Sequence, residues 1–502
     1  MAGSLTVTST PGRWTGPAAA AVLLLAGAAP FVLNHPPPAR TGGGPGFSVE
    51  RAWSHIEAVA RAPHPVGTPE HDRVRSYLLA ELTAPGFVVD TQTVQMDRRA
   101  GNTLRSVPVR NVMARLPGTG SGSAVLLLSH YDAVPVSFGA GDDGVGVATV
   151  LETARQLAAG GTPRRDVIIL ITDAEELGLL GAQAFAEAHP WMADVGVVLN
   201  FEARGMSGPA LMFETGPRSG ELVRALGRVG RRPVTSSLLP EAYRRLPNDT
   251  DFTIFARRGL PGLNFALAGS AHWYHTPGDR PENLSRASLQ HMGDNALALA
   301  RHLAGLPAAA ERSEAPVYFS VPGLGLVHYP AGLAIPLAVL LVGAYLAVGV
   351  YAGRQGRLGW WGLLAGLLAG VLSVVVAAVA AMGVWVLVRD LHPEYGSVIG
   401  RALYTEWPYL AAFVALPIAV VLAVFGVLRR WLGPEALALG ALLGPVLLAA
   451  ATALQPAVSY VYLWPTALAL AAVVLQVRAA GPAAGAGTGV PAGDDRTPVR
   501  GA

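Results

Sequence analysis

The segment VIILITDAEELG, residues 167–178, joins a continuous apolar run to an acidic loop. Three further short apolar runs lie elsewhere in the first half of the chain, at 124–128, 195–200 and 263–267. Segments with helical apolar periodicity flank or separate them, at 74–82, 144–158, 179–188, 221–229 and 287–303. Continuous apolar strands that alternate with helices predict an α/β fold, with a mostly parallel central sheet flanked by helices.

Acids and histidines gather where these strands should end, which is where ligands bind in such sheets. The set consists of His130, Asp142, Glu176, Glu202 and His275. Taken singly, each residue has an ordinary explanation, such as a helix cap or a solvated acid at a strand end. Together, two imidazoles and three carboxylates can hold two divalent cations, with one ligand shared between them. The chain contains no cysteine, so thiolate ligands and disulfides are excluded.

Two of the histidines have neighbours that bear on their roles. Asp132 lies two residues after His130, on the same side of an extended chain. A carboxylate in that place can fix the tautomer of a metal-binding imidazole and raise its basicity. His272 lies three residues before His275 and competes with it for the same role.

In each of two pairs of adjacent acidic residues, we expect the two members to have different roles. In GAGDDG, residues 139–144, one aspartate can present both oxygens to two cations, while the other caps the helix that follows. In the loop after 167–172, Glu175 and Glu176 diverge. One of them can bind metal while the other faces the open water site, as a hydrolase needs of its general base.

The motifs, taken in order, resemble those of the co-catalytic di-zinc exopeptidases, the family that includes bacterial aminopeptidase S. They are HYD (130–132), GAGDDG (139–144), DAEELG (173–178), NFEARG (200–205) and YHTPGD (274–279). The resemblance covers roughly residues 50–305 and implies a zinc aminopeptidase-like fold. It implies that one zinc ion is held by His130, Asp142 and Glu202, and a second by Asp142, Glu176 and His275. It further implies that Glu175 is the general acid/base and that Asp132 belongs with it to the catalytic group.

The function implied by this resemblance is a zinc-dependent exopeptidase of the aminopeptidase type. Such an enzyme hydrolyses N-terminal peptide bonds of peptides or proteins through water activated by two Zn2+ ions. Two alternatives remain beside it: a glutaminyl cyclase-like enzyme with a single zinc, and a non-catalytic membrane module in which a metal only stabilises the fold. The carboxyl-terminal apolar region and the EARG segment resemble the vacuolar membrane protease branch.

Composition adds a membrane part, since 51% of residues are hydrophobic and only 14% are charged. Residues 14–33 are apolar, long enough for an anchor, and also carry a signal-like Ala-Gly-Ala. Five later spans are predicted at 333–352, 359–388, 408–428, 434–454 and 457–477. Arginines cluster in alternate connecting loops, which predicts six spans in the lipid bilayer with the 35–330 region outside the cytoplasm. The net charge of +3 is too small to indicate nucleic-acid binding.

These observations divide the chain into six parts. They are a transmembrane anchor or signal-like segment (1–34), a linker (35–46), a zinc peptidase domain (47–310), a connector (311–330), a five-helix all-α transmembrane domain (331–478) and a disordered tail (479–502).

Overall fold

The computed structural model describes most of the chain outside its two ends. The described residues are 35–40, 46–83, 86–100, 103–120, 122–307, 313–396, 403 and 406–479. The predicted first span at 14–33 and all but the first residue of the predicted tail lie outside them. Two compact units are separated, one made mainly of residues up to Leu333 and the other mainly of the apolar helices beyond it.

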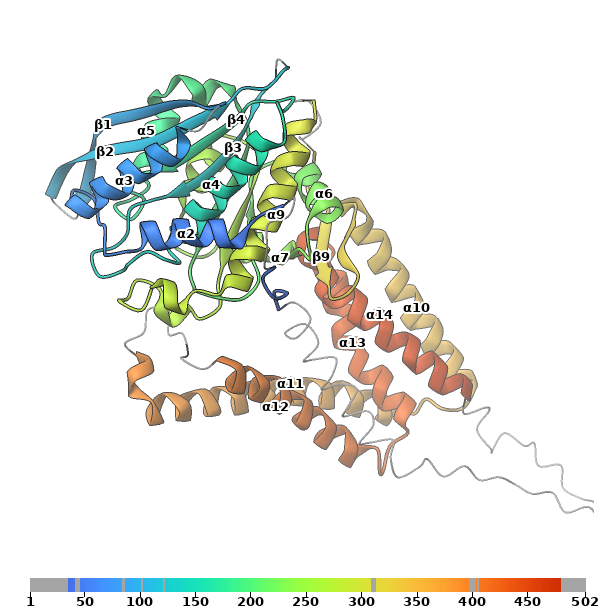
Figure 1. Cartoon of the computed structure of the whole chain (residues 1–502). Helices are drawn as coiled ribbons and strands as arrows, with labels where there is room; N and C mark the ends of the chain where they lie inside the picture. The colour runs from blue at the N-terminus through green and yellow to red at the C-terminus, as the bar shows by residue number, and fades with distance from the viewer. Residues whose placement is uncertain are drawn as a thin grey trace, which may run out of the picture. The chain divides into compact units, whose positions relative to one another are not determined.

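A mixed eight-stranded sheet forms the centre of the first unit (Figure 1), in the order β1-β2-β4-β3-β5-β8-β6-β7. Its strands are β1 (Val88–Ala100), β2 (Thr103–Leu116), β3 (Ala124–His130), β4 (Val167–Thr172), β5 (Val195–Ala203), β6 (Leu211–Thr215), β7 (Val234–Thr235) and β8 (Gly262–Leu267). The adjacent strands β4, β3, β5 and β8 run parallel, and they are the four predicted strands. Antiparallel partners extend this parallel centre on either side: β2 beside β4, β1 beside β2, and β6 beside β8.

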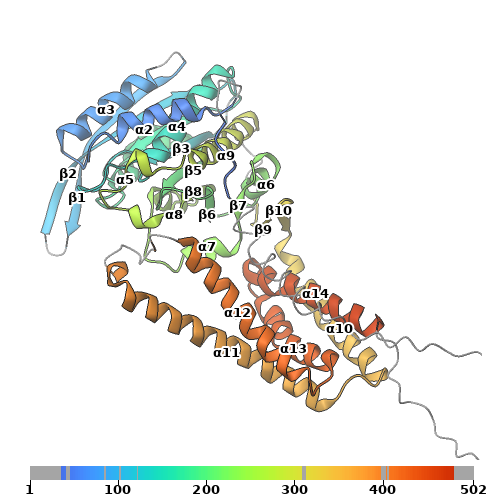
Figure 2. The ribbon, with the colours of Figure 1, turned by 60° about the horizontal axis from the view of Figure 1, so that its bottom comes forward.

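The parallel centre is covered on both faces, and every residue of its four strands is buried. One face packs against α2 (Val49–Val59), α3 (Pro69–Leu82), α4 (Gly144–Ala159), α6 (Gly220–Val229) and α9 (Arg286–Gly305) (Figure 2). The other packs against α5 (Leu180–Ala188) and α8 (Asp251–Arg257).

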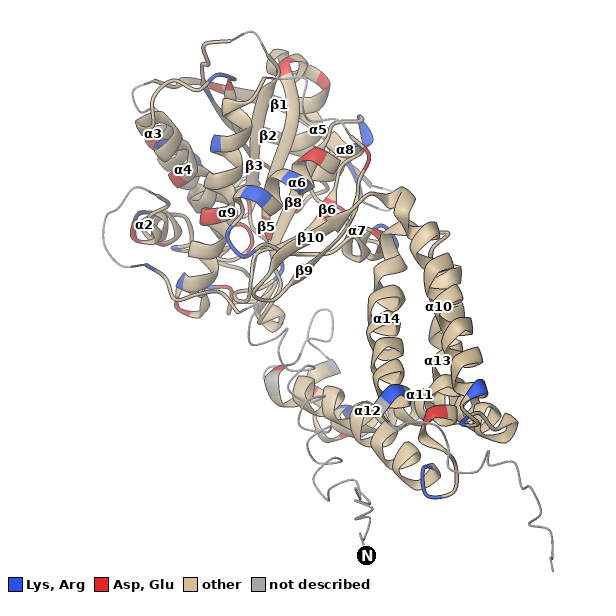
Figure 3. Cartoon of the chain, turned by 90° about the vertical axis from the view of Figure 1, so that its right-hand side faces the viewer, with Lys and Arg blue, Asp and Glu red and all other residues tan. Residues whose placement is uncertain are grey.

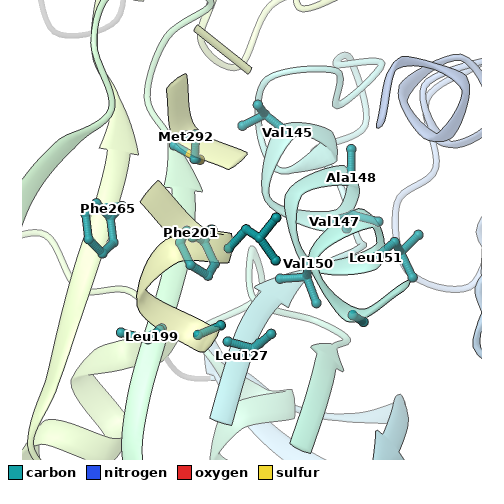
Figure 4. Close-up of a cluster of buried hydrophobic side chains, with 14 of the residues drawn as sticks. Leu127, Val145, Val147, Ala148, Val150, Leu151, Leu199, Phe201, Phe265 and Met292 are labelled. Carbon is teal, nitrogen blue, oxygen red and sulfur yellow. The ribbon is translucent and has the colours of Figure 1, made fainter. Parts of the chain in front are cut away.

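The core between α4 and the sheet is built from the predicted apolar runs (Figure 4). Leu127 of β3 and Phe201 of β5 lie against Val147 and Val150 of α4, and all four side chains are fully buried. Burying each such side chain contributes about 1.5–3 kcal/mol. This packing holds the ends of β3 and β5 in place beside the start of α4.

Several elements depart from the sequence expectation. Exposed polar residues alternate along β1, so it has no continuous apolar run, yet it forms a long hairpin with β2. The predicted connector at 311–330 contains a second hairpin, β9 (Val317–Val321) with β10 (Gly325–Tyr329). The helices α2 and α8 were not predicted either. The periodicity of α2 is clear, however, since its inner face is buried.

Five helices of the carboxyl-terminal region are long and apolar enough to cross a membrane. They are α10 (Ala334–Arg354), α11 (Trp360–Leu391), α12 (Glu406–Leu428), α13 (Pro434–Thr452) and α14 (Pro456–Ala479). Figure 3 shows that charged residues are sparse along them and lie near their ends. Each predicted later span coincides with one of these helices.

The glycines spaced at four residues in α11 serve helix packing. A Cβ at Gly366 would lie 2.2 Å from the carbonyl oxygen of Leu437, and one at Gly440 would lie 2.1 Å from that of Leu363. The backbones of α11 and α13 therefore approach too closely for any larger side chain, as in other small-residue helix contacts.

Candidate metal centre

The five predicted ligands converge at the carboxyl ends of the parallel strands. His130 is the last residue of β3, Glu202 lies at the end of β5, and Glu176 follows β4. Asp142 precedes α4, and His275 lies beyond β8. The side chains form two groups that share Asp142, and within each group the donor atoms lie within 4.8 Å of one another. The groups are His130, Asp142 and Glu202, and Asp142, Glu176 and His275.

The distances within the two groups suit metal ligation. Nε2 of His130 lies 3.2 Å from Oδ1 of Asp142 and 3.6 Å from Oε2 of Glu202. Nε2 of His275 lies 2.9 Å from Oδ2 of Asp142 and 2.9 Å from Oε1 of Glu176. Ligand atoms around a tetrahedral zinc ion, with bonds of about 2.0–2.2 Å, are roughly 3.4 Å apart. Each oxygen of Asp142 thus faces one histidine, and the residues fit a pair of zinc ions.

Asp132 positions the loop that carries Glu175 and Glu176, and not only the imidazole of His130. Its two carboxylate oxygens accept hydrogen bonds from the backbone N–H groups of Glu175 (2.9 Å) and Glu176 (3.2 Å). Nδ1 of His130 is 3.0 Å from the backbone carbonyl oxygen of Asp132 and 3.6 Å from its carboxylate. His130 and Asp132 are close neighbours, as expected. The imidazole, however, lies closer to the backbone carbonyl oxygen of Asp132 than to its carboxylate.

The two aspartates of GAGDDG have separate tasks. Asp143 is the N-cap of α4, and its carboxylate accepts hydrogen bonds from the N–H groups of Gly146 (3.0 Å) and His130 (3.2 Å). Asp142 is left to face the two histidines. His272, the rival of His275, belongs to neither of the two groups found among the described residues.

Asp279 fixes the position of the GAGDDG loop and was given no role from the sequence. It accepts hydrogen bonds from the N–H groups of Gly141 (2.6 Å) and Asp142 (3.3 Å) and from the hydroxyl of Ser137 (2.8 Å). These partners lie some 140 residues earlier in the chain, so only the folded structure reveals them. The aspartate that closes YHTPGD was the available signal.

Hydrogen bonds from buried asparagine side chains position Glu202. Nδ2 of Asn200 donates to Oε1 of Glu202 (3.3 Å) and to Oδ1 of Asn264 (3.0 Å). Nδ2 of Asn264 in turn donates to the carboxylate of Glu214 (2.9 Å) and to the hydroxyl of Thr250 (2.9 Å). This network was not predicted from the sequence, because buried asparagines in strands carry no distinguishing pattern.

The centre concentrates negative charge in a buried place. Burial opposes ionisation of Asp142, but hydrogen bonds from His130 and His275 hold its pKa below the usual range. Burial and the charge of Asp142 raise the pKa of Glu176 to about 7. Burial lowers the pKa of His275, yet the carboxylates of Asp142 and Glu176 outweigh it and raise the value to about 9. Such a cluster of carboxylates is stabilised by positive charge, which bound cations supply.

Glu175 lies beside the two groups without belonging to either. Burial raises its pKa well above the usual range, and the carboxylates of Glu202 and Glu176 add to the shift, whereas His130 opposes it. A carboxyl group with a raised pKa can both accept and return a proton near neutral pH. The position and the pKa of Glu175 therefore suit a general acid/base.

A cavity of about 850 Å³ opens onto the centre. Five acidic residues line it, and four of them belong to the centre or lie beside it: Asp142, Glu175, Glu176 and Glu202, with Asp249 as the fifth. Its apolar wall includes Leu179, Leu211, Phe213, Leu246 and Ile254. The centre is therefore accessible to a ligand with an apolar part.

Part of the chain matches a known peptidase family. Residues 111–300 match the model of Peptidase family M28. Endoplasmic reticulum metallopeptidase 1 of Mus musculus is 32% identical over 340 residues, which cover 63% of this chain and 38% of the relative. Vacuolar membrane protease of Candida albicans (strain SC5314 / ATCC MYA-2876) is 35% identical over 252 residues, which cover 50% and 29%. The chain thus spans 38% of the length of the first relative and 29% of the second.

Solved structures with a similar fold include BSAP, a zinc aminopeptidase from Bacillus subtilis, at 17% identity and a TM-score of 0.44, covering 54% of this chain and 99% of that one. Porphyromonas gingivalis glutaminyl cyclase is 21% identical with a TM-score of 0.43, covering 51% and 98%. These likenesses are distant, and the family model is the more specific finding. Residues 111–300 thus match a domain of Peptidase family M28, and among the described residues five helices are long and apolar enough to cross a membrane.

Proposed function

We propose that this chain is a membrane-anchored zinc exopeptidase that removes N-terminal residues from peptides or proteins. The observation that carries the proposal is the pair of ligand groups sharing Asp142, with the non-ligand Glu175 beside them in one cavity. A site that binds metal only to stabilise the fold would be closed by protein ligands and would have no need of Glu175.

The proposed ligands are those of the two groups, one zinc ion for each. Bound zinc supplies Lewis-acid polarisation of a carbonyl and lowers the pKa of water. Glu175 accepts the proton of the attacking water and returns it to the departing amine, a transfer worth about 10²–10⁴ in rate. Asp132 keeps Glu175 and Glu176 in place through their backbone N–H groups.

The preference for an N-terminal residue rests on charge and on the resemblance to aminopeptidases. The free α-amino group of a peptide is positive, and the carboxylates that line the cavity attract it. The apolar wall then receives the side chain of the same residue.

The test uses the full-length chain in detergent, loaded with zinc, with aminoacyl p-nitroanilides as substrates. Release of p-nitroaniline by the wild type, its loss on chelation, and its loss in Glu175→Gln with metal content unchanged are the expected results. Cyclisation of an N-terminal glutamine without peptide-bond hydrolysis would instead identify a glutaminyl cyclase. Stoichiometric zinc without turnover on either kind of substrate would identify a non-catalytic module.

We also propose a six-span topology with the 47–310 domain outside the cytoplasm. Arg354 ends α10 and Arg357 follows it, and Arg429 and Arg430 follow α12, so we assign both loops to the cytoplasmic side. Because the chain has no cysteine, single cysteines placed in these loops and in the soluble domain can be labelled in intact cells without interference. Labelling of the soluble domain alone by a membrane-impermeant maleimide is expected.

A further inference from the structure

We propose that Arg204 binds a carboxylate on the leaving residue of the substrate, so that dipeptides with a free C-terminal carboxylate are the preferred substrate class. This inference rests on the proposed peptidase function and deepens it. Arg204 follows β5 directly, two residues after the proposed metal ligand Glu202. Arg204 and Glu202 both line the cavity at the centre.

The backbone of Arg204 is anchored at the sheet edge. Its N–H donates to the carbonyl oxygen of Leu267 (2.8 Å), which continues the pairing of β5 with β8. Its side chain is exposed and lines the cavity. The guanidinium carbon lies 5.4 Å from the ring centre of Tyr274, and that ring stacks on the imidazole of His275 at 3.8 Å. The ring of Tyr274 therefore contacts both the guanidinium and the imidazole of a proposed ligand.

The charges in the cavity single out Arg204. Arg257 is the other arginine that lines the cavity, and it forms an ion pair with Asp249 (3.0 Å). Within the described parts of the chain, the guanidinium of Arg204 makes a cation–π contact with Tyr274 and has no carboxylate partner. A guanidinium presents a planar fork of donors that matches a carboxylate. An incoming carboxylate can fill that place without displacing an ion pair.

The charge of the ligand set permits an anionic group at the rim of the centre. Two bound zinc ions would carry four positive charges, and they would offset the carboxylates of Asp142, Glu175, Glu176 and Glu202. Arg204 then adds a positive charge in the same cavity. In a dipeptide the terminal carboxylate carbon lies only three bonds beyond the scissile carbonyl carbon, within about 4 Å. The carboxylate of a dipeptide thus lies close to the centre, in the cavity that Arg204 also lines.

The experiment compares matched substrates on the zinc-loaded full-length chain in detergent. Leu-Leu is compared with Leu-Leu-amide, and Leu-Asp-amide with Leu-Asn-amide, by the ratio of kcat/KM within each pair. We expect the wild type to favour the carboxylate-bearing member by about 10- to 100-fold, the range of a charge-assisted hydrogen bond. Preference in the first pair identifies the C-terminal carboxylate, and preference in the second identifies an acidic side chain. Arg204→Gln should bring the ratio close to one, and Arg204→Lys should restore part of it.

The matched control is the double variant Asp249→Asn with Arg257→Gln, which removes an ion pair from the same cavity without changing its net charge. This variant should keep the wild-type ratio of kcat/KM. Calorimetry can measure the affinities of a non-hydrolysable Leu-Leu analogue with a reduced peptide bond, once as the acid and once as the amide. The ratio of these two affinities reports the same preference for a carboxylate without turnover. A wild-type ratio near one, or a ratio that survives Arg204→Gln, overturns the role of Arg204 while leaving the peptidase proposal intact. Absence of hydrolysis of every substrate by the wild type overturns the peptidase proposal, and calorimetry still reports on Arg204.

Discussion

Replacing Asp132 by Asn tests how the acidic loop is held in place. The carboxylate of Asp132 is almost fully buried and accepts one hydrogen bond from each of the backbone N–H groups of Glu175 and Glu176. Asn keeps the size of the side chain but has one oxygen instead of two. One of the two N–H groups must then face an amide NH2 group and lose its acceptor.

The magnitude follows from that count. A buried donor left without a partner costs about 1–3 kcal/mol, so the free energy of unfolding should fall by that amount. The loop that carries Glu175 and Glu176 should also shift, and loss of a supporting hydrogen bond at a metal site typically costs 10- to 100-fold in metal affinity or activity. Asp132→Asn should therefore weaken zinc binding and lower kcat/KM, each by about one to two orders of magnitude.

The assay measures zinc affinity by competition with a chromogenic chelator and kcat/KM on an aminoacyl p-nitroanilide. The control is Asp166→Asn, because the carboxylate of Asp166 accepts a hydrogen bond from the N–H of Gly118 (2.6 Å) and pairs with Arg115, away from the centre. The control should lose stability while keeping zinc affinity. Zinc affinity and kcat/KM within threefold of the wild type in Asp132→Asn would refute the reasoning.

Further predictions address catalysis, metal, pH and the membrane region. Glu175→Gln should lower kcat by about 10²–10⁴ with two zinc ions still bound, as measured by turnover and metal analysis. Chelation should lower the melting temperature and added zinc should restore it, since a ligand of the folded state stabilises it. Burial raises the pKa of Glu214 to about 7. The stability that its protonated form provides is present below about pH 4.5 and is lost as pH rises through 7. The free energy of unfolding of Glu214→Gln should therefore exceed that of the wild type by about 2–4 kcal/mol at pH 8.5 and by little at pH 5. Gly366→Leu should separate α11 from α13 and lower the melting temperature in detergent, whereas Gly383→Leu, where a Cβ meets nothing within 4 Å, should not.

The parallel centre of the sheet was predictable because buried parallel strands are continuous apolar runs. Each of β3, β4, β5 and β8 corresponds to such a run, with acids or histidines at or after its end. The hairpin of β1 and β2 was not predictable in this way, since its polar residues are stabilised by pairing between strands. An antiparallel edge needs no apolar run when one of its faces meets water.

The convergence of the candidate ligands was predictable for the same reason, because strand ends meet at one edge of a parallel sheet. The supporting contacts were not. Asp132 binds backbone N–H groups, which have no sequence signature, and the partners of Asp279 lie far away along the chain. Asn200 and Asn264 meet only because β5 and β8 are neighbours in the sheet.

Anomalous X-ray scattering at the zinc edge, on crystals of the full-length chain grown with zinc, would locate the bound ions. We predict two peaks, one among His130, Asp142 and Glu202 and the other among Asp142, Glu176 and His275, with Asp142 next to both. A single peak, or peaks away from these side chains, would contradict the proposed metal centre.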